Sequence, residues 1–152
     1  MVSRDITYTD YDGKEKTDKF WFNLTPADVQ DLNLEIPGGL QSVTQDLETD
    51  PNIVKILKTF KMIILKAYGV RTPDKKFYKD EIETKAFAAS DAFSQLFLDF
   101  MNNESKDDVV AFISAMFPQG MEIAKAAKEA EEAESNKIAG RIELQDHKKP
   151  QQ

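Results

Sequence analysis

Three segments of the chain carry apolar residues at helical spacing, and together they predict a helical core. The most apolar segment runs from residue 50 to about residue 68, where large apolar residues recur at three- and four-residue intervals. We expect this helix to be central and covered on more than one side, with Asp50 and Pro51 at its start and Gly69 as its stop. Its apolar stripe comprises Ile53, Ile56, Leu57, Phe60, Ile63 and Ile64.

The other two amphipathic helices follow serines that are placed to cap them, Ser90 and Ser105. Thr25-Pro26 and Asp80 predict the starts of two shorter helices, and apolar residues at helical spacing follow Gly39. Residues 70–79 contain Thr-Pro-Asp and three lysines, and we interpret them as a loop. The two main stripes are Phe93, Leu96, Phe97, Phe100 and Met101, and then Val109, Phe112, Ile113, Met116 and Phe117.

The first 22 residues predict a β-hairpin, in one of two registers. A two-residue turn at Asp12-Gly13 would place apolar residues opposite lysine and threonine on the same face, whereas a three-residue loop pairs Val2 with Phe22. We favour the second register because it gathers the apolar residues on one face, points Trp21 to the other and needs Gly13 in the left-handed conformation. The gathered residues are Val2, Ile6, Tyr8, Phe20 and Phe22.

The predicted fold is therefore α+β and mostly α, with an N-terminal hairpin followed by a bundle of about five to six helices. A length of 152 residues fits one compact domain. We place this domain at residues 1–120. Residues 121–152 are rich in Ala, Glu and Lys, and we expect a weakly docked helix there that frays into a polar tail.

Composition excludes several classes of function. The chain has 20 basic and 27 acidic residues, and this net charge of −7 is the wrong sign for phosphate neutralisation, so nucleic acid is a poor candidate partner. There is no cysteine and one histidine, His147, in a polar tail, so we expect no metal, no cofactor and no catalytic site. Neither a membrane-spanning stretch nor a secretion signal is apparent, and we expect a soluble, cytoplasmic-type protein.

Charged clusters in the chain have plain structural interpretations. The acids at 80, 81 and 83 suit a helix start, because residues 81 and 83 point to different sides of a helix. Asp10 to Gly13 resembles a calcium loop only faintly and is typical of a turn. The lysines at 55, 58, 61 and 66 are interpreted as a solvated helix edge rather than a binding strip.

Phenylalanine and methionine are concentrated between residues 87 and 121, beyond what two short helices need for a core. Leu98 lies off the apolar stripe of its helix. An exposed surface of this kind would be an adaptable binding site for apolar helices of another protein. The candidate partner-binding residues are Phe97, Leu98, Phe100, Met101, Met116, Phe117 and Met121.

The order of several segments resembles the tail assembly chaperones of tailed phages with long, non-contractile tails. The resemblance covers about residues 6–118 and depends on order and spacing rather than on one diagnostic motif. The segments that carry it are Ile6 to Gly13, Phe20 to Thr25, Gly38-Gly39-Leu40, Ile64 to Val70, Phe77, Phe87 and Ala92 to Phe97.

The resemblance implies a non-enzymatic protein of the host cytoplasm that is absent from the mature virion. Its partners would be the tape-measure protein, which it keeps soluble, and the tail-tube protein, with a frameshifted longer form as one route of recruitment. We also expect a homo-oligomer formed through the hairpin residues Ile6, Tyr8, Phe20, Trp21 and Phe22. The alternatives are a tail-completion or head–tail connector protein, and an acidic inhibitor of a host enzyme.

Overall fold

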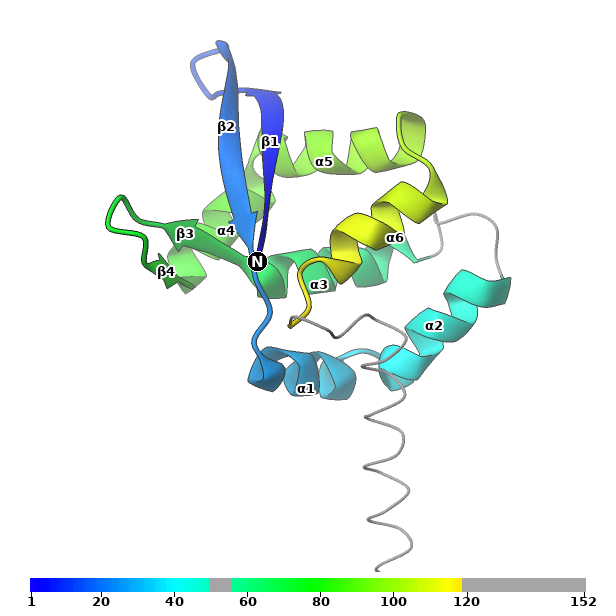
Figure 1. Ribbon diagram of the computed structural model, residues 1–152. Helices are drawn as coiled ribbons and strands as arrows, with labels where there is room; N and C mark the ends of the chain where they lie inside the picture. The colour runs from blue at the N-terminus through cyan, green and yellow to red at the C-terminus, as the bar shows by residue number, and fades with distance from the viewer. Residues whose placement is uncertain (50–55, 119–152) are drawn as a thin grey trace, which may run out of the picture.

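The computed structural model describes residues 1–49 and 56–118, and within them it confirms the predicted α+β fold (Figure 1). The predicted helix start at residues 50 and 51 and the segment 121–152 lie outside the described residues. The elements are β1 (Val2–Thr9), β2 (Glu15–Phe22), α1 (Pro26–Glu35), α2 (Gly39–Thr49), α3 (Leu57–Ala67), β3 (Tyr68–Arg71), β4 (Phe77–Tyr78), α4 (Glu81–Ala89), α5 (Asp91–Asn102) and α6 (Lys106–Ser114).

The hairpin adopts the predicted register. Val2 pairs with Phe22, and Gly13 has a φ of +80°, as a three-residue loop requires. Trp21 pairs with Ser3, so its side chain lies on the face opposite the apolar cluster. The Asp10 carboxylate accepts hydrogen bonds from two backbone amides of the turn, which confirms a turn there.

The hairpin is part of a four-stranded antiparallel sheet of order β1-β2-β3-β4, and the prediction of a loop at residues 70–79 was wrong. β3 and β4 are four and two residues long, so pairing with neighbours rather than local sequence determines them. α3 ends at Ala67, and Gly69 belongs to β3 instead of stopping the helix. A Cβ atom at Gly69 would lie 2.3 Å from Cζ of Phe77, so glycine lets the β4 ring cover β3.

Four of the predicted N-terminal helix caps are confirmed, those at Thr25, Asp80, Ser90 and Ser105. Thr25 and Asp28 form a reciprocal capping box at the start of α1, with Pro26 as its first residue. Asp80, Ser90 and Ser105 each accept a hydrogen bond from the amide three residues on. These caps satisfy amides that would otherwise lack partners at the starts of four helices.

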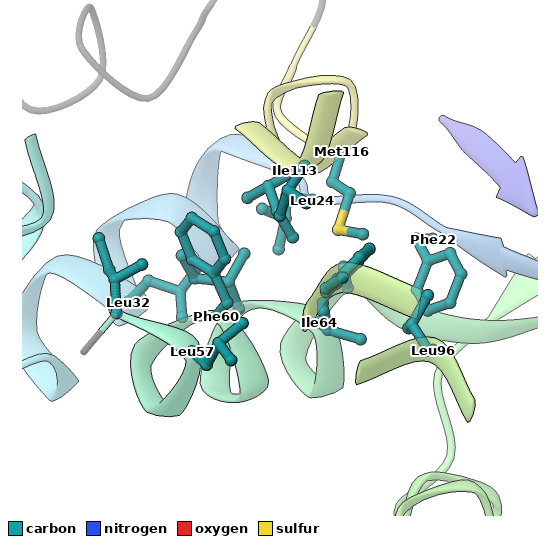
Figure 2. Close-up of a cluster of buried hydrophobic side chains, with 14 of the residues drawn as sticks. Phe22, Leu24, Leu32, Leu57, Phe60, Ile64, Leu96, Ile113 and Met116 are labelled. Carbon is teal, nitrogen blue, oxygen red and sulfur yellow. The ribbon is translucent and has the colours of Figure 1, made fainter. Parts of the chain in front are cut away.

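α3 lies at the centre of the core, as its apolar stripe predicts (Figure 2). Phe60, Ile63 and Ile64 have no exposed surface. α1, α5, α6 and the base of β2 surround them, and each fully buried large side chain contributes about 1.5–3 kcal/mol to folding. The labelled residues in Figure 2 are Phe22, Leu24, Leu32, Leu57, Phe60, Ile64, Leu96, Ile113 and Met116.

Candidate functional site

The outward side of α5 exposes two large apolar side chains. Leu98 and Met101 are 46% and 53% exposed, and a spacing of three residues places them on the same side of the helix. Ser90 caps α5 and also donates a hydrogen bond to the carbonyl of Phe87 at 2.6 Å, which fixes the turn from α4. We call Leu98 and Met101 the α5 outer surface.

The structure buries four of the other residues predicted to bind a partner. Phe97, Phe100, Met116 and Phe117 are each no more than 7% exposed, and Met121 lies outside the described residues. They line the core because α5 packs along β1 and α6 packs on α3. The carbonyl of Met116 also accepts a hydrogen bond from Leu24 N–H at 2.8 Å, which connects the segment after α6 to the segment after β2.

An aromatic row supports the α5 outer surface from beneath. The Phe97 ring meets the rings of Phe93 and Phe100 edge to face, at centroid distances of 4.9 and 5.5 Å. Lys61 Nζ of α3 lies 5.2 Å from the Phe97 ring centroid. Lys61 is exposed and its ammonium group lies near this ring, which agrees with the interpretation of a solvated helix edge.

A second set of contacts ties α5 to the hairpin. The Arg4 guanidinium of β1 donates a hydrogen bond to Glu104, in the turn before α6. It also lies over the rings of Phe100 and Phe112, 5.4 and 5.1 Å from their centroids. The inward side of α5 is thus immobilised while its outward side stays exposed.

Four of the five hairpin residues predicted to mediate self-assembly face the helices. Ile6 and Phe22 are buried, and Tyr8 and Phe20 are half-buried. Phe20 contacts Phe87 at 5.2 Å between centroids, so this face of the hairpin is used to hold the sheet on α4. Burial raises the pKa of Tyr8, and the hydrogen bond that its hydroxyl donates to Asp18 raises it further.

Trp21 lies on the outer face of the sheet between two basic side chains. Lys19 Nζ is 6.0 Å and Arg71 Cζ is 5.4 Å from the ring. The prediction of a loop at residues 70–79 gave no reason to single out Arg71. The alternation of Tyr68, Val70 and Tyr78 around a Pro-Asp turn was the available signal for a second, shorter hairpin.

Comparison with known proteins decides the family. The model of the family described as phage tail assembly chaperone matches residues 1–151. The chain belongs to the phage tail assembly chaperone family. Neither the curated proteins nor the solved structures contain a significant match to it.

The chaperone's acidic clusters take the structural roles predicted for them. Asp80 caps α4, and Glu81 pairs with Lys85 at 3.0 Å. Over residues 1–49 and 56–118, no group of three or more His, Cys, Asp or Glu side chains is placed to hold a metal ion. Every helix in the same part of the chaperone is too short or too polar to span a bilayer.

Proposed function

We propose that this chaperone binds the phage tape-measure protein through the α5 outer surface and keeps it soluble until the tail tube assembles, without catalysing a reaction. The observation that carries the proposal is the pair Leu98 and Met101, two flexible apolar side chains exposed side by side on a firmly anchored helix. A helical partner with an apolar face would cover them through i, i+3 and i+4 contacts.

The net charge of the chain and the small size of the α5 outer surface support a reversible complex. The chain carries a net charge of −7, which limits aggregation of a protein that exposes apolar side chains. Two exposed side chains bury too little area for permanent association, so release as the tube assembles needs no large conformational change. The proposal also includes recruitment of tail-tube subunits and self-association through the hairpin. Of the five hairpin residues predicted to mediate self-association, Trp21 is the one that faces outward.

Co-expression with the tape-measure protein of the same phage tests the proposal. Because Phe97 and Met116 are buried, aspartate at those positions would unfold the chain, and the informative variant is Leu98→Asp with Met101→Asp. Its matched control is Leu34→Asp with Ile82→Asp, which removes two exposed apolar side chains (83% and 77%) elsewhere and adds the same charge.

We expect the α5 variant to lose most of the soluble tape-measure protein and the control to keep it, with both variants folded by circular dichroism. Equal soluble yields from the two variants would overturn the proposal. Mass spectrometry of purified particles checks the assembly-stage role, because a chaperone of this kind should be absent from virions, whereas a connector protein would be present in stoichiometric amounts.

A further inference from the structure

Most of the strand β2 is hydrogen-bonded to a neighbour along one edge only. β1 pairs with it from Glu15 to Phe22, but β3 pairs with it at Trp21 and Phe22 alone. Figure 1 shows β3 and β4 turning away from the hairpin at this point. Residues 15–20 of β2 therefore have no strand partner on the β3 side within the part of the chain that the structure describes.

The register identifies which backbone groups point toward this open edge. The amide of Asp10 donates to the carbonyl of Lys14 at 2.8 Å, so even-numbered residues of β2 exchange hydrogen bonds with β1 and odd-numbered ones point away. Asn23 N–H, which donates to the Ala67 carbonyl at 2.9 Å on the β3 side, confirms the direction. The N–H and C=O groups of Thr17 and Lys19 thus face the open edge.

The sequence of β3 explains why the edge stays open. If β3 continued in register, Arg71 would lie opposite Lys19 and Pro73 opposite Thr17. Like charges in directly opposed positions are destabilising, and proline has no N–H to donate. The chain instead turns at Thr72, whose amide donates to the Lys76 carbonyl at 2.8 Å.

Charge and shape at this edge indicate the ligand. Lys19 and Arg71 both lie over the Trp21 ring, and neither forms an ion pair within residues 1–49 and 56–118. A hollow of about 350 Å³ is lined by residues 18–21 of β2, by residues 68–71 of β3 and by Tyr8 of β1. The carboxylate of Asp18 in this hollow is engaged by the Tyr8 hydroxyl.

We propose that the β2–β3 edge, defined by Thr17, Lys19, Trp21 and Arg71, binds an extended segment of a partner protein with acidic side chains at alternate positions. Alternate side chains of a strand share one face, so an added strand would bring its carboxylates to Lys19 and Arg71 while its backbone pairs with Thr17 and Lys19. This inference is independent of tape-measure binding through α5.

A peptide probe tests the edge directly on the full chain. The probe is a fluorescent ten-residue peptide of alternating valine and glutamate, followed by fluorescence anisotropy in 50 mM salt. One control peptide replaces glutamate by lysine, and another carries N-methyl groups on every amide. We expect both controls to bind at least about tenfold more weakly, because one loses the charge pairing and the other the backbone hydrogen bonds.

Two matched pairs of variants locate the site. Thr17→Pro removes an N–H from the β2–β3 edge, and Thr7→Pro removes one from the opposite edge; both lose the same 2.7 Å contact between the two hydroxyls. We expect only Thr17→Pro to abolish binding. Lys19→Glu with Arg71→Glu should reverse the preference between the charged peptides, whereas Lys58→Glu with Lys85→Glu should not.

Three results would overturn the inference. They are equal loss of binding in Thr17→Pro and Thr7→Pro, undiminished binding of the N-methylated peptide, and equally strong competition by single-stranded DNA, which would show charge attraction alone. Sedimentation velocity provides a fourth check, because a dimer that Thr17→Pro dissociates would assign the edge to a second copy. Tape-measure solubility on co-expression should be unchanged by Thr17→Pro, so this inference and the proposed function can fail separately.

Discussion

The α5 outer surface and the β2–β3 edge are both exposed, yet they offer partners opposite chemistry. Leu98 and Met101 present apolar area without directional hydrogen bonds, whereas the edge presents backbone donors and acceptors beside two cations and an indole ring. Apolar contacts tolerate many partner sequences, and strand pairing requires an extended segment in one register. If both proposals hold, the chain combines a permissive binding surface with a selective one.

The difference also has a structural origin. The α5 outer surface stands on a helix whose inward residues are buried, so its geometry is set by the core. The β2–β3 edge exists because β3 diverges from β2 after Gly69, so its geometry depends on the short hairpin in which Val70 pairs with Tyr78 and Arg71 with Phe77. Substitutions on α5 and at Gly69 of β3 separate these two dependences.

The largest change in unfolding free energy should come from a substitution on the inward side of α5. Phe100→Ala removes a ring that is 1% exposed and should cost about 3–5 kcal/mol of unfolding free energy. Met101→Ala, one residue away, should change it by no more than about 0.5 kcal/mol. Urea denaturation of both variants measures the contrast, and similar costs would show that α5 does not have separate structural and exposed sides.

A smaller change in unfolding free energy is expected from a glycine substitution at the base of the β2–β3 edge. Gly69→Ala places a Cβ atom against the Phe77 ring and should destabilise the chain by about 1–3 kcal/mol. Gly13→Ala, at a turn with open space around it, should cost about 1–2 kcal/mol through its positive φ alone and leave edge binding intact. Peptide binding that survives Gly69→Ala unchanged would show that β3 does not shape the edge.

The pH dependence of stability should reflect Asp28. Burial opposes ionisation of this carboxyl, but hydrogen bonds from Lys79 and Thr25 and attraction by Lys79 outweigh it, so its pKa is lowered from 3.8. A lowered folded-state pKa adds stability that is present above the unfolded pKa and disappears as pH falls through the folded one. Asp28→Asn should cost about 1 kcal/mol at pH 7 and flatten the unfolding free energy between about pH 5 and pH 2.

Chemical denaturation at a series of pH values checks this expectation. Asp31→Asn is a suitable control, because Asp31 is an exposed residue of the same helix that lies 3.7 Å from Lys66. A parallel loss of stability on acidification in wild type and Asp28→Asn would contradict the assignment.

The smallest predicted effect is that of salt on partner binding, and it should differ between the two surfaces. Raising sodium chloride from 50 to 500 mM screens exposed charges, so binding of the acidic peptide should weaken several-fold. Tape-measure binding through the α5 outer surface should not weaken, since burial of apolar surface is insensitive to screening. Salt-sensitive binding of both partners, measured by anisotropy and by pull-down, would remove the distinction.

Local signals made much of the fold predictable from the sequence. The register of the hairpin followed from Gly13 and the apolar alternation, and the capping residues marked the starts of α1, α4, α5 and α6. β3 and β4 were not predicted, because strands this short are stabilised mainly by pairing, β3 with β2 and β4 with β3.

The candidate site was predictable only in part, for a similar reason. Leu98 could be assigned to the surface because it lies off the helical stripe, and it is exposed. Phe97 and Phe100 lie on the stripe, and their burial depends on β1 and α3, which a count of apolar residues does not place. Arg71 could be assigned to the site at Trp21 only from the path of β3, which the sequence did not predict.

Site-specific photo-crosslinking in infected cells tests the central claim, that this chaperone shields an apolar surface of another polypeptide with α5, most directly. A photoreactive amino acid replacing Met101 should crosslink to the tape-measure protein before tails are complete, and the same amino acid replacing Leu34 should not. Crosslinking from position 34 but not from 101, or crosslinks from 101 only to proteins other than the tape-measure protein, would contradict the account.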